Sequence, residues 1–239
     1  MKNFKKYAKE FNFHNKKVKY KYYHSFRVKK FSEYLAKKLK LSRNDKKLAS
    51  FIGLYHDIGR FSQVTEFDTF EDAKSIDHAE VGYNLLKKRK FLNNFNTKEK
   101  NIILKAVKNH NKFKIEKGLN NRELMHAKII RDADKIDIIR MISKGNIFDF
   151  KSITYNISND VNEDFFKHKL INNKKQASMG DKLIRNLSLV YDISFNESLK
   201  YLYKEKYFNK IYKRIPNNQV YKKYFDEINK YIEKRLEIC

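Results

Sequence analysis

Residues 42–60 read SRNDKKLASFIGLYHDIGR, and their pattern is that of an amphipathic helix. The apolar residues of one face recur at helical spacing and are Leu48, Phe51, Ile52 and Tyr55. Ser42 and Asp45 form a short-armed variant of a capping box at the start, and the apolar stripe runs to His56 and ends at Gly59. The stretch therefore predicts a helix that places a histidine and an aspartate at its C-terminal end.

The same spacing predicts four more helices, over residues 24–39, from Asp77, from Thr97 and over residues 121–143. Each carries a histidine or an aspartate on or beside its apolar face, in order His24, His78, His110 and Asp134. Two more aspartates, Asp132 and Asp137, share the last of these helices. Polar groups are thus expected on the inner side of every helix in the first part of the chain.

The fold class follows from composition and from the rest of the pattern. Six glycines and one proline in 239 residues argue against a strand-rich fold, which needs many tight turns. Residues 153–157 alternate in polarity but are too short for a sheet, and helical spacing returns over residues 183–191 and 220–232. We therefore expect an all-α protein with a core over residues 1–143 and a C-terminal helical extension over residues 144–239, packed on the same domain.

Charge is the most conspicuous bulk property of the chain. The 54 lysines and arginines outnumber the 28 aspartates and glutamates, which gives a formal net charge of +26. Arginine is the residue expected where phosphate is bound bidentately, yet only ten of the cations are arginine, so the excess indicates a lysine-rich background more than a nucleic-acid partner. Residues 51–80 reverse the trend, with two cations against seven anions, a net charge of −5.

Three classes of protein are disfavoured. No apolar run approaches the roughly 20 residues needed to cross a bilayer, and the basic start of the chain is not followed by the apolar stretch of a signal peptide. The single cysteine, Cys239, excludes a disulfide framework and a thiolate metal cluster. We expect a cytoplasmic protein without a membrane partner.

Six residues occupy positions that apolar residues normally take, on or beside the inward faces of the predicted helices: His24, His56, Asp57, His78, His110 and Asp134. Charged and titratable groups are rarely buried unless they are paired or bind a metal, so their convergence predicts a metal site. Imidazoles and carboxylates without thiolates suit iron, manganese, cobalt, nickel or zinc. Six ligands suit two ions that share a carboxylate, and Asp57 is the natural bridge because it directly follows His56.

These residues resemble a known family. The order H, HD, H, H, D over residues 20–143 resembles the HD superfamily of metal-dependent phosphohydrolases, with the central pair in LYHDIGRF and the last aspartate in RDADKID. The additional histidines, His78 in DHAEVGYNLL and His110 in AVKNHNK, resemble the branch that binds two metals. That branch includes HD-GYP phosphodiesterases and symmetric diadenosine tetraphosphate hydrolases. The resemblance implies a helical bundle that carries a dinuclear site.

The chain departs from two of these groups. Asn109 stands before His110 where HD-GYP enzymes have a second histidine, and their glycine-tyrosine-proline signature is absent, which disfavours hydrolysis of cyclic diguanylate. Gly59 and Arg60 stand near the position where stringent-response nucleotide hydrolases carry an acidic pair, which disfavours hydrolysis of (p)ppGpp.

The resemblance implies a role for each site residue. One ion would bind His24, His56 and Asp134, the other would bind His78 and His110, and Asp57 would bridge them. We predict Asp57 as a catalytic residue because it would also help orient the attacking hydroxide, and Arg60 and Lys135 because substrate oxygens need cations. The predicted substrate-binding residues are Arg27, Arg60 and Arg131, and the alternative for each of these cations is an ordinary surface position.

Other polar residues are expected outside the ligand set. We expect Asp132 and Asp137 on the surface or behind the ligands, His126 beside the site, and His14 and His168 in solvent. Residues 61–76 are expected to form a lid or rim over the site, or a loop packed by its own aromatic side chains.

The leading functional hypothesis is a phosphohydrolase that cleaves a phosphoester or phosphoanhydride bond of a nucleotide-type substrate through a metal-bridging hydroxide. Its cofactors would be two divalent transition-metal ions, and its partner a phosphate-containing small molecule. The first alternative is a metal-dependent HD nuclease acting on single-stranded nucleic acid, for which the basic first fifty residues would form an electrostatic track. The second alternative is a non-catalytic regulator that binds metal and nucleotide.

Overall fold

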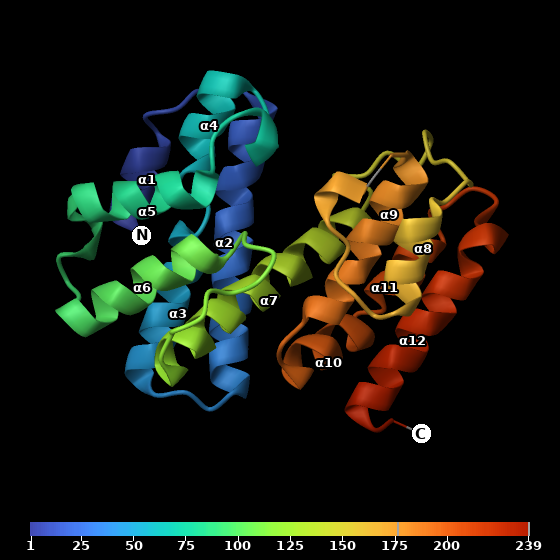
Figure 1. Ribbon diagram of the computed structural model, residues 1–239. Coiled ribbons are helices and arrows are strands. Elements are labelled where there is room, and N and C mark those ends of the chain that lie inside the picture. Colours follow the sequence, from blue (N-terminus) through green and yellow to red (C-terminus); the bar gives the residue numbers. More distant parts are fainter. Residues whose placement is uncertain (176, 239) are drawn as a thin grey trace. The chain divides into compact units, whose positions relative to one another are not determined.

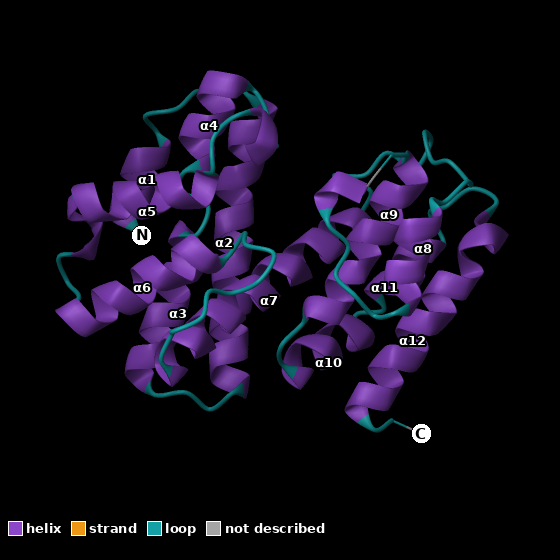
Figure 2. Ribbon diagram, in the orientation of Figure 1, coloured by secondary structure: helices purple, strands orange, loops and turns teal. Residues whose placement is uncertain are grey.

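Helices make up the ordered framework of the chain in the computed structural model, which describes residues 1–175 and 177–238 (Figure 1). Figure 2 shows helices and loops, and no strand, over these described residues, so the predicted all-α fold is confirmed. The chain divides into two compact units, Met1–Asp134 and Lys135–Cys239, and the division falls inside one helix. Cys239, on which the exclusion of disulfides and thiolate clusters rests, lies outside the described residues.

The first unit contains seven helices or parts of helices within its described residues: α1 (Lys2–Ala8), α2 (Lys16–Lys38), α3 (Arg43–Tyr55), α4 (Arg60–Phe67), α5 (His78–Lys88), α6 (Thr97–Asn109) and α7 (Asn121–Ser143) up to Asp134. The five predicted helices correspond to α2, α3, α5, α6 and α7. Helix α3 ends at Tyr55, four residues before Gly59, and the chain turns there into α4, which the sequence pattern did not predict.

Caps explain where the helices begin. The side chain of Ser42 accepts a hydrogen bond from the Asp45 N–H at the start of α3, as the capping pattern predicted. The side chain of Asp77 accepts hydrogen bonds from the backbone at the start of α5, which makes His78 the first residue of that helix. Helix α6 begins with a full capping box formed by Asn96 and Glu99.

Two glycines allow the close approaches that bring the site together. A Cβ on Gly53 of α3 would lie 2.6 Å from the Ser32 hydroxyl oxygen of α2, so α2 and α3 can touch only because Gly53 has no side chain. A Cβ on Gly59 would lie 2.2 Å from the backbone oxygen of His78. The turn after α3 is therefore held directly against the first turn of α5. Figure 1 shows the other contact, with α2 and α3 side by side.

Aromatic side chains anchor the short helices α1 and α4. Phe4 is fully buried and packs edge-on against Tyr55 and Phe61, with ring centroids 5.2 and 5.9 Å apart. Residues 61–76, expected to form a lid, a rim or a packed loop, contain most of α4 followed by a single 3-10 turn, Asp72–Lys74. The first aromatic of this stretch, Phe61, belongs to the core, whereas Phe67 is exposed.

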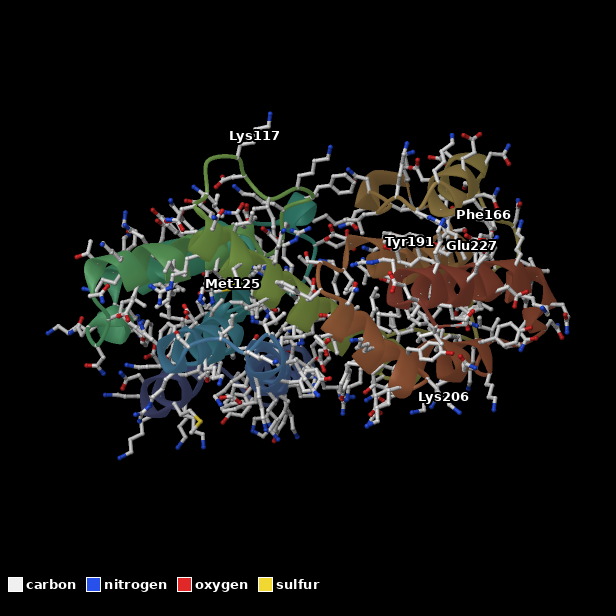
Figure 3. All side chains as sticks on the ribbon, turned by 90° about the horizontal axis from the view of Figure 1, so that it is seen from below. Lys117, Met125, Phe166, Tyr191, Lys206 and Glu227 are labelled. Atoms are coloured by element: carbon white, nitrogen blue, oxygen red, sulfur yellow. The ribbon has the colours of Figure 1, made fainter. Side chains whose placement is uncertain are left out.

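The second unit continues from α7 and contains α8 (Asn159–Phe166), α9 (Met179–Leu187), α10 (Asn196–Lys204), α11 (Tyr207–Tyr212) and α12 (Lys222–Leu236). Residues 153–157 form no strand, as expected from their short length. Phe165 and Tyr224 pack at 5.1 Å in its aromatic core, and Figure 3 labels Phe166, Tyr191 and Glu227 in the same unit. Among the described residues, no helix is both long and apolar enough to cross a membrane.

Candidate metal centre

All six predicted metal ligands meet in the first unit, and each comes from a helix or from the residue or two after a helix end. His24 lies in α2, the pair His56 and Asp57 directly follows α3, His78 opens α5, His110 follows α6, and Asp134 lies in α7. The four histidines and Asp57 are buried, with at most 6% of each residue exposed. Helices that pack by their apolar faces therefore deliver polar groups to one point.

Asp57 lies at the middle of this group, and its two oxygens face different histidine pairs. Oδ2 is 3.4 Å from Nε2 of His24 and 3.5 Å from Nε2 of His56. Oδ1 is 3.2 Å from Nε2 of His78 and 3.3 Å from Nε2 of His110. One carboxylate thus joins two ligand groups, which is the arrangement required of a bridging ligand.

Asp134 completes the first group. Its Oδ1 lies 3.1 Å from Nε2 of His24 and 3.8 Å from Nε2 of His56. In the second group the Nε2 atoms of His78 and His110 are 3.0 Å apart. Donor atoms of His24, His56 and Asp134 are close enough together to hold one ion, as are those of His56, Asp57 and His110.

Hydrogen bonds behind the imidazoles decide which nitrogen faces the centre. Nδ1 of His56 donates to the Gly53 carbonyl at 2.9 Å, and Nδ1 of His110 donates to the Val107 carbonyl at 2.7 Å. A carbonyl can only accept, so each Nδ1 carries a hydrogen and each neutral ring presents the lone pair of Nε2 to the centre. Such outer partners fix the tautomer of metal-binding histidines.

The outer partner of His78 is a carboxylate that the sequence did not single out. Asp72 lies in the 3-10 turn after α4, and both of its oxygens are 2.8 Å from Nδ1 of His78. The amide of Asn111 donates to Asp72 at 3.1 Å and to Asp77 at 2.9 Å, which ties the turn to the start of α5. The acidic stretch over residues 51–80 was the available signal, because a carboxylate is a common outer partner of a metal-bound histidine.

Burial and charge set the protonation of the centre. Burial lowers the pKa of His56 to about 3, which keeps this ring neutral and able to bind a metal at pH 7. Burial alone would raise the pKa of Asp57, but the nearby Lys21 ammonium outweighs it and holds that pKa well below its ordinary value. The pKa of Asp134 is likewise held low against the effect of burial, by its interaction with His24, so both carboxylates are ionised.

The donor set fits divalent cations. With Nδ1 protonated in both rings, His78 and His110 direct two lone pairs at each other across 3.0 Å, an arrangement that is repulsive unless a cation or proton lies between or beside them. The Nε2 atom of His56 is fully buried and forms no hydrogen bond to any described residue. Nitrogen and oxygen donors without sulfur match the predicted transition metals.

The comparison with known families agrees with this geometry. The HD domain family matches residues 22–139, a range that contains all six ligands. Residues 22–139 are an HD domain. HD domains form a superfamily of metal-dependent hydrolases. Comparisons of the chain with curated proteins and with solved structures give no match.

Arg60 is the predicted substrate-binding cation that the HD domain places beside the ligands. Its Nη1 donates to Asp72 at 2.8 Å and to the Phe70 carbonyl at 2.6 Å, and its Nε lies 3.7 Å from Oδ1 of Asp57. The side chain of Gln63 also bonds Asp72, at 2.9 Å. Arg60 is therefore held in place by the carboxylate that also holds His78.

The other three predicted cations have different surroundings. Arg131 is buried, and its guanidinium donates to the backbone carbonyls of Asn109, His110, Lys112 and Phe113, so it holds the segment that follows α6. Lys135 is buried in the second unit, 2.7 Å from Asp192. Arg27 lies over the ring of Tyr20, 5.8 Å from its centroid, and that ring stacks on His24.

Lys21 is a residue of the site that the sequence pattern did not indicate. Its Nζ lies 2.6 Å from Oδ2 of Asp57, and 13% of its side chain is exposed. It precedes His24 by three residues and so shares its helix face. In a chain with 44 lysines, this spacing alone did not distinguish it.

The other polar residues considered in the sequence lie in different surroundings. Asp132 and Asp137 are fully buried, so the surface alternative is wrong for both. His126 belongs to none of the possible ligand groups of the described residues and bonds Asp45 at 3.0 Å. His14 and His168 are exposed, as predicted.

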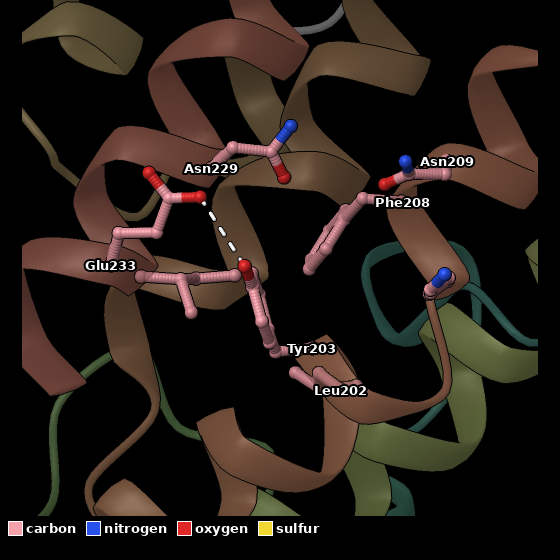
Figure 4. A pocket seen from close by; sticks show the side chains of 8 residues that line it. Leu202, Tyr203, Phe208, Asn209, Asn229 and Glu233 are labelled. Atoms are coloured by element: carbon pink, nitrogen blue, oxygen red, sulfur yellow. Dashed lines mark hydrogen bonds between the residues drawn. The ribbon is translucent and has the colours of Figure 1, made fainter. Parts of the chain in front are cut away.

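The described part of the second unit contains hollows but no comparable ligand group. One hollow there has a volume of about 200 Å³. Figure 4 shows Tyr203, Phe208, Asn229 and Glu233 among its lining residues. Its one drawn interaction is the hydrogen bond from the Tyr203 hydroxyl to Glu233, at 3.4 Å. The possible ligand groups among the described residues therefore all lie in the HD domain.

Proposed function

We propose that this chain is a metal-dependent phosphohydrolase that cleaves a phosphoester or phosphoanhydride bond of a nucleotide-type substrate. The observation that carries the proposal is the position of Asp57, whose two oxygens face two separate histidine pairs at 3.2 to 3.5 Å. A carboxylate in this position supports two ions rather than one. Paired ions are a recurrent solution for phosphoryl transfer.

The distances from the two oxygens of Asp57 separate the proposed ligands into two groups. His24, His56, Asp134 and Oδ2 of Asp57 would hold one divalent transition-metal ion, and His78, His110 and Oδ1 of Asp57 would hold the other. When bound, such a pair of ions makes a water acidic near neutral pH and neutralises charge on the phosphoryl group.

The chain's own residues supply position and exclusion of water. The Nδ1 hydrogen bonds of His56, His78 and His110 keep each Nε2 aimed at the centre. Among the ligands, the side chain of Asp134 is the most exposed, at 20%, and the side chain of Asp72, the outer partner of His78, is 30% exposed. Substrate would enter beside these two carboxylates, where the reacting group is shielded from most of the solvent.

A phosphate group approaching this opening would meet two cations and an aromatic ring. Arg60 and Lys21 flank Asp57, at 3.7 and 2.6 Å, and supply the positive charge that binds phosphate oxygens. The ring of Phe70 lies 5.2 Å from the Lys21 ammonium and 5.9 Å from the Arg60 guanidinium. Cations next to an aromatic ring suit a substrate that combines phosphate with a flat base, which supports a nucleotide.

The test is a metal analysis of the purified chain, followed by a hydrolysis screen of mononucleotides, cyclic dinucleotides, dinucleoside polyphosphates and labelled single-stranded DNA and RNA. We expect hydrolysis of a nucleotide in this screen, abolished in Asp57→Ala and retained in Asp68→Ala. Asp68 is a matched control because it lies in the same acidic stretch but pairs with Lys17 at the surface, with 74% of its side chain exposed.

Two results would overturn this proposal in favour of the alternatives. Cleavage of oligonucleotides alone would identify a nuclease, which the net charge of +26 would then help to explain. Binding of metal and nucleotide without turnover of any substrate in the screen would identify a regulator.

A further inference from the structure

Lys21 has a position that ordinary ion pairing does not require. Its Nζ is 2.6 Å from Oδ2 of Asp57, the same oxygen that faces Nε2 of His24 at 3.4 Å and Nε2 of His56 at 3.5 Å. A positive ammonium thus lies on the inner oxygen of the ligand group, beside two imidazole nitrogens. This is where a cation bound by that group would take its carboxylate ligand.

We propose that Lys21 serves as the cation on Asp57 Oδ2 in the metal-free protein, and that a divalent ion displaces its ammonium toward the phosphate of the substrate. The first part concerns metal binding alone. The second part, in which the displaced ammonium contacts phosphate, rests on the proposed function.

Electrostatics favours the exchange. The carboxylate of Asp57 is buried and that of Asp134 is only 20% exposed, and buried charge without a partner is costly. Arg60 does not serve as this partner, because its Nη1 is bonded to Asp72 and its Nε is 3.7 Å from the other oxygen, Oδ1. Lys21 lies within hydrogen-bonding distance of Oδ2, so it stabilises the ligand group before metal arrives.

The surroundings of Lys21 let it leave without losing all its partners. Its ammonium lies 5.2 Å from the centroid of Phe70 and 5.7 Å from the centroid of Tyr20, within the range of cation–π attraction. The 13% of its side chain that is exposed gives the flexible stem an outward path. An ammonium that moves off Asp57 would therefore remain at the mouth of the site, where phosphate enters.

Removal of Lys21 should change the metal affinity in opposite directions for a competing lysine and for a purely structural one. A lysine that only braces Asp57 helps the ligands stay in place, so its removal should weaken metal binding. A lysine that competes with metal should have the opposite effect, because removal destabilises the metal-free state and leaves the metal-bound state unchanged.

The first experiment is calorimetric titration of the metal-free full chain with Mn²⁺, comparing wild type, Lys21→Met and the control Lys17→Met. A charge-assisted hydrogen bond corresponds to about a tenfold or larger effect on an equilibrium constant, so we expect Lys21→Met to bind the ion of the His24, His56 and Asp134 group about ten times more strongly. Its melting temperature should fall without metal and match wild type with metal. Lys17, one turn earlier in α2, pairs with the exposed Asp68, and its variant should behave as wild type. Unchanged or weaker Mn²⁺ binding by Lys21→Met would overturn the proposal.

A second experiment uses the wild-type chain and so does not depend on how the variant folds. Lysine acetylation is followed by mass spectrometry without metal, with Mn²⁺, and with Mn²⁺ plus inorganic phosphate. We expect Lys21 to react slowly, then faster, then slowly again, while Lys17 stays constant. No acceleration by Mn²⁺ would overturn the displacement, and no protection by phosphate would overturn the contact with substrate. Neither of these readouts requires hydrolysis, so a chain that lacks phosphohydrolase activity would disprove the proposed function without altering the Mn²⁺ result.

Discussion

Replacing Asp72 is expected to weaken the binding of one metal ion and to leave the binding of the other unchanged. Both oxygens of Asp72 lie 2.8 Å from Nδ1 of His78, whereas the corresponding partner of His56 is the backbone carbonyl of Gly53, which no side-chain substitution removes. Asp72→Asn keeps one acceptor for the imidazole but removes the negative charge, and Asp72→Ala removes both. The effect should therefore be confined to the ion held by His78 and His110.

The size of the effect depends on which acceptor the His78 imidazole retains. Outer partners of metal-binding histidines typically contribute about 10- to 100-fold in affinity, or roughly 1.4 to 2.7 kcal/mol. We expect Asp72→Asn to lower the affinity for this ion about tenfold, because an acceptor remains, and Asp72→Ala to lower it about a hundredfold. Arg60 also loses its 2.8 Å ion pair in both variants, so substrate affinity should fall in parallel.

The assay is calorimetric titration with Mn²⁺, resolved into a tighter and a weaker binding step. Glu71→Gln is the matched control, because Glu71 precedes Asp72 and its side chain pairs with the exposed Lys74, at 2.8 Å. Equal weakening of both steps in the Asp72 variants, or no change in either, would refute the reasoning that assigns His78 to a separate ion.

Three further predictions concern stability and assembly of the centre. Gly59→Ala places a Cβ about where the His78 backbone oxygen lies, 2.2 Å away, so we expect a loss of at least about 1 to 3 kcal/mol in urea unfolding and a weaker second Mn²⁺ step. Burial lowers the pKa of His126, so the unfolded chain takes up a proton that the folded chain does not as pH falls below about 6.5. Stability should drop by up to about 1.4 kcal/mol per pH unit there, and His126→Gln should remove this part of the slope. Ser42→Ala removes the cap of α3 and should cost about 1 kcal/mol of unfolding free energy without changing metal stoichiometry.

Periodicity predicted the helices that carry the site because each has a long apolar face. The spacing of Leu48, Ile52 and Tyr55 indicated α3, and the cap at Asp77 indicated α5. Helices α1 and α4 escaped prediction because they have seven and eight residues, too few for a period to be distinguished. Their position is determined by aromatic packing around Phe4 and Phe61, which depends on residues distant in sequence.

The ligands were predictable because six titratable residues interrupt apolar faces, an arrangement with few explanations other than a metal. The partners of the cations around the ligands were harder to predict. Arg131 and Lys135 are as close to Asp134 in sequence as Lys21 is to His24, yet they bind a backbone segment and Asp192, respectively. Helix rotation alone does not determine which partner a long side chain reaches. Asp72 was missed because its link to His78 depends on the turn after α4.

The central claim is that Asp57 joins two metal ions. The most direct test is electron paramagnetic resonance of the metal-free chain titrated with Mn²⁺, which reports how many ions bind and whether two are close enough to couple magnetically. We predict about two Mn²⁺ per chain with a coupled signal in wild type, and one uncoupled Mn²⁺ in His78→Ala. A wild-type chain that saturates at one Mn²⁺, or binds two without coupling, would contradict the claim.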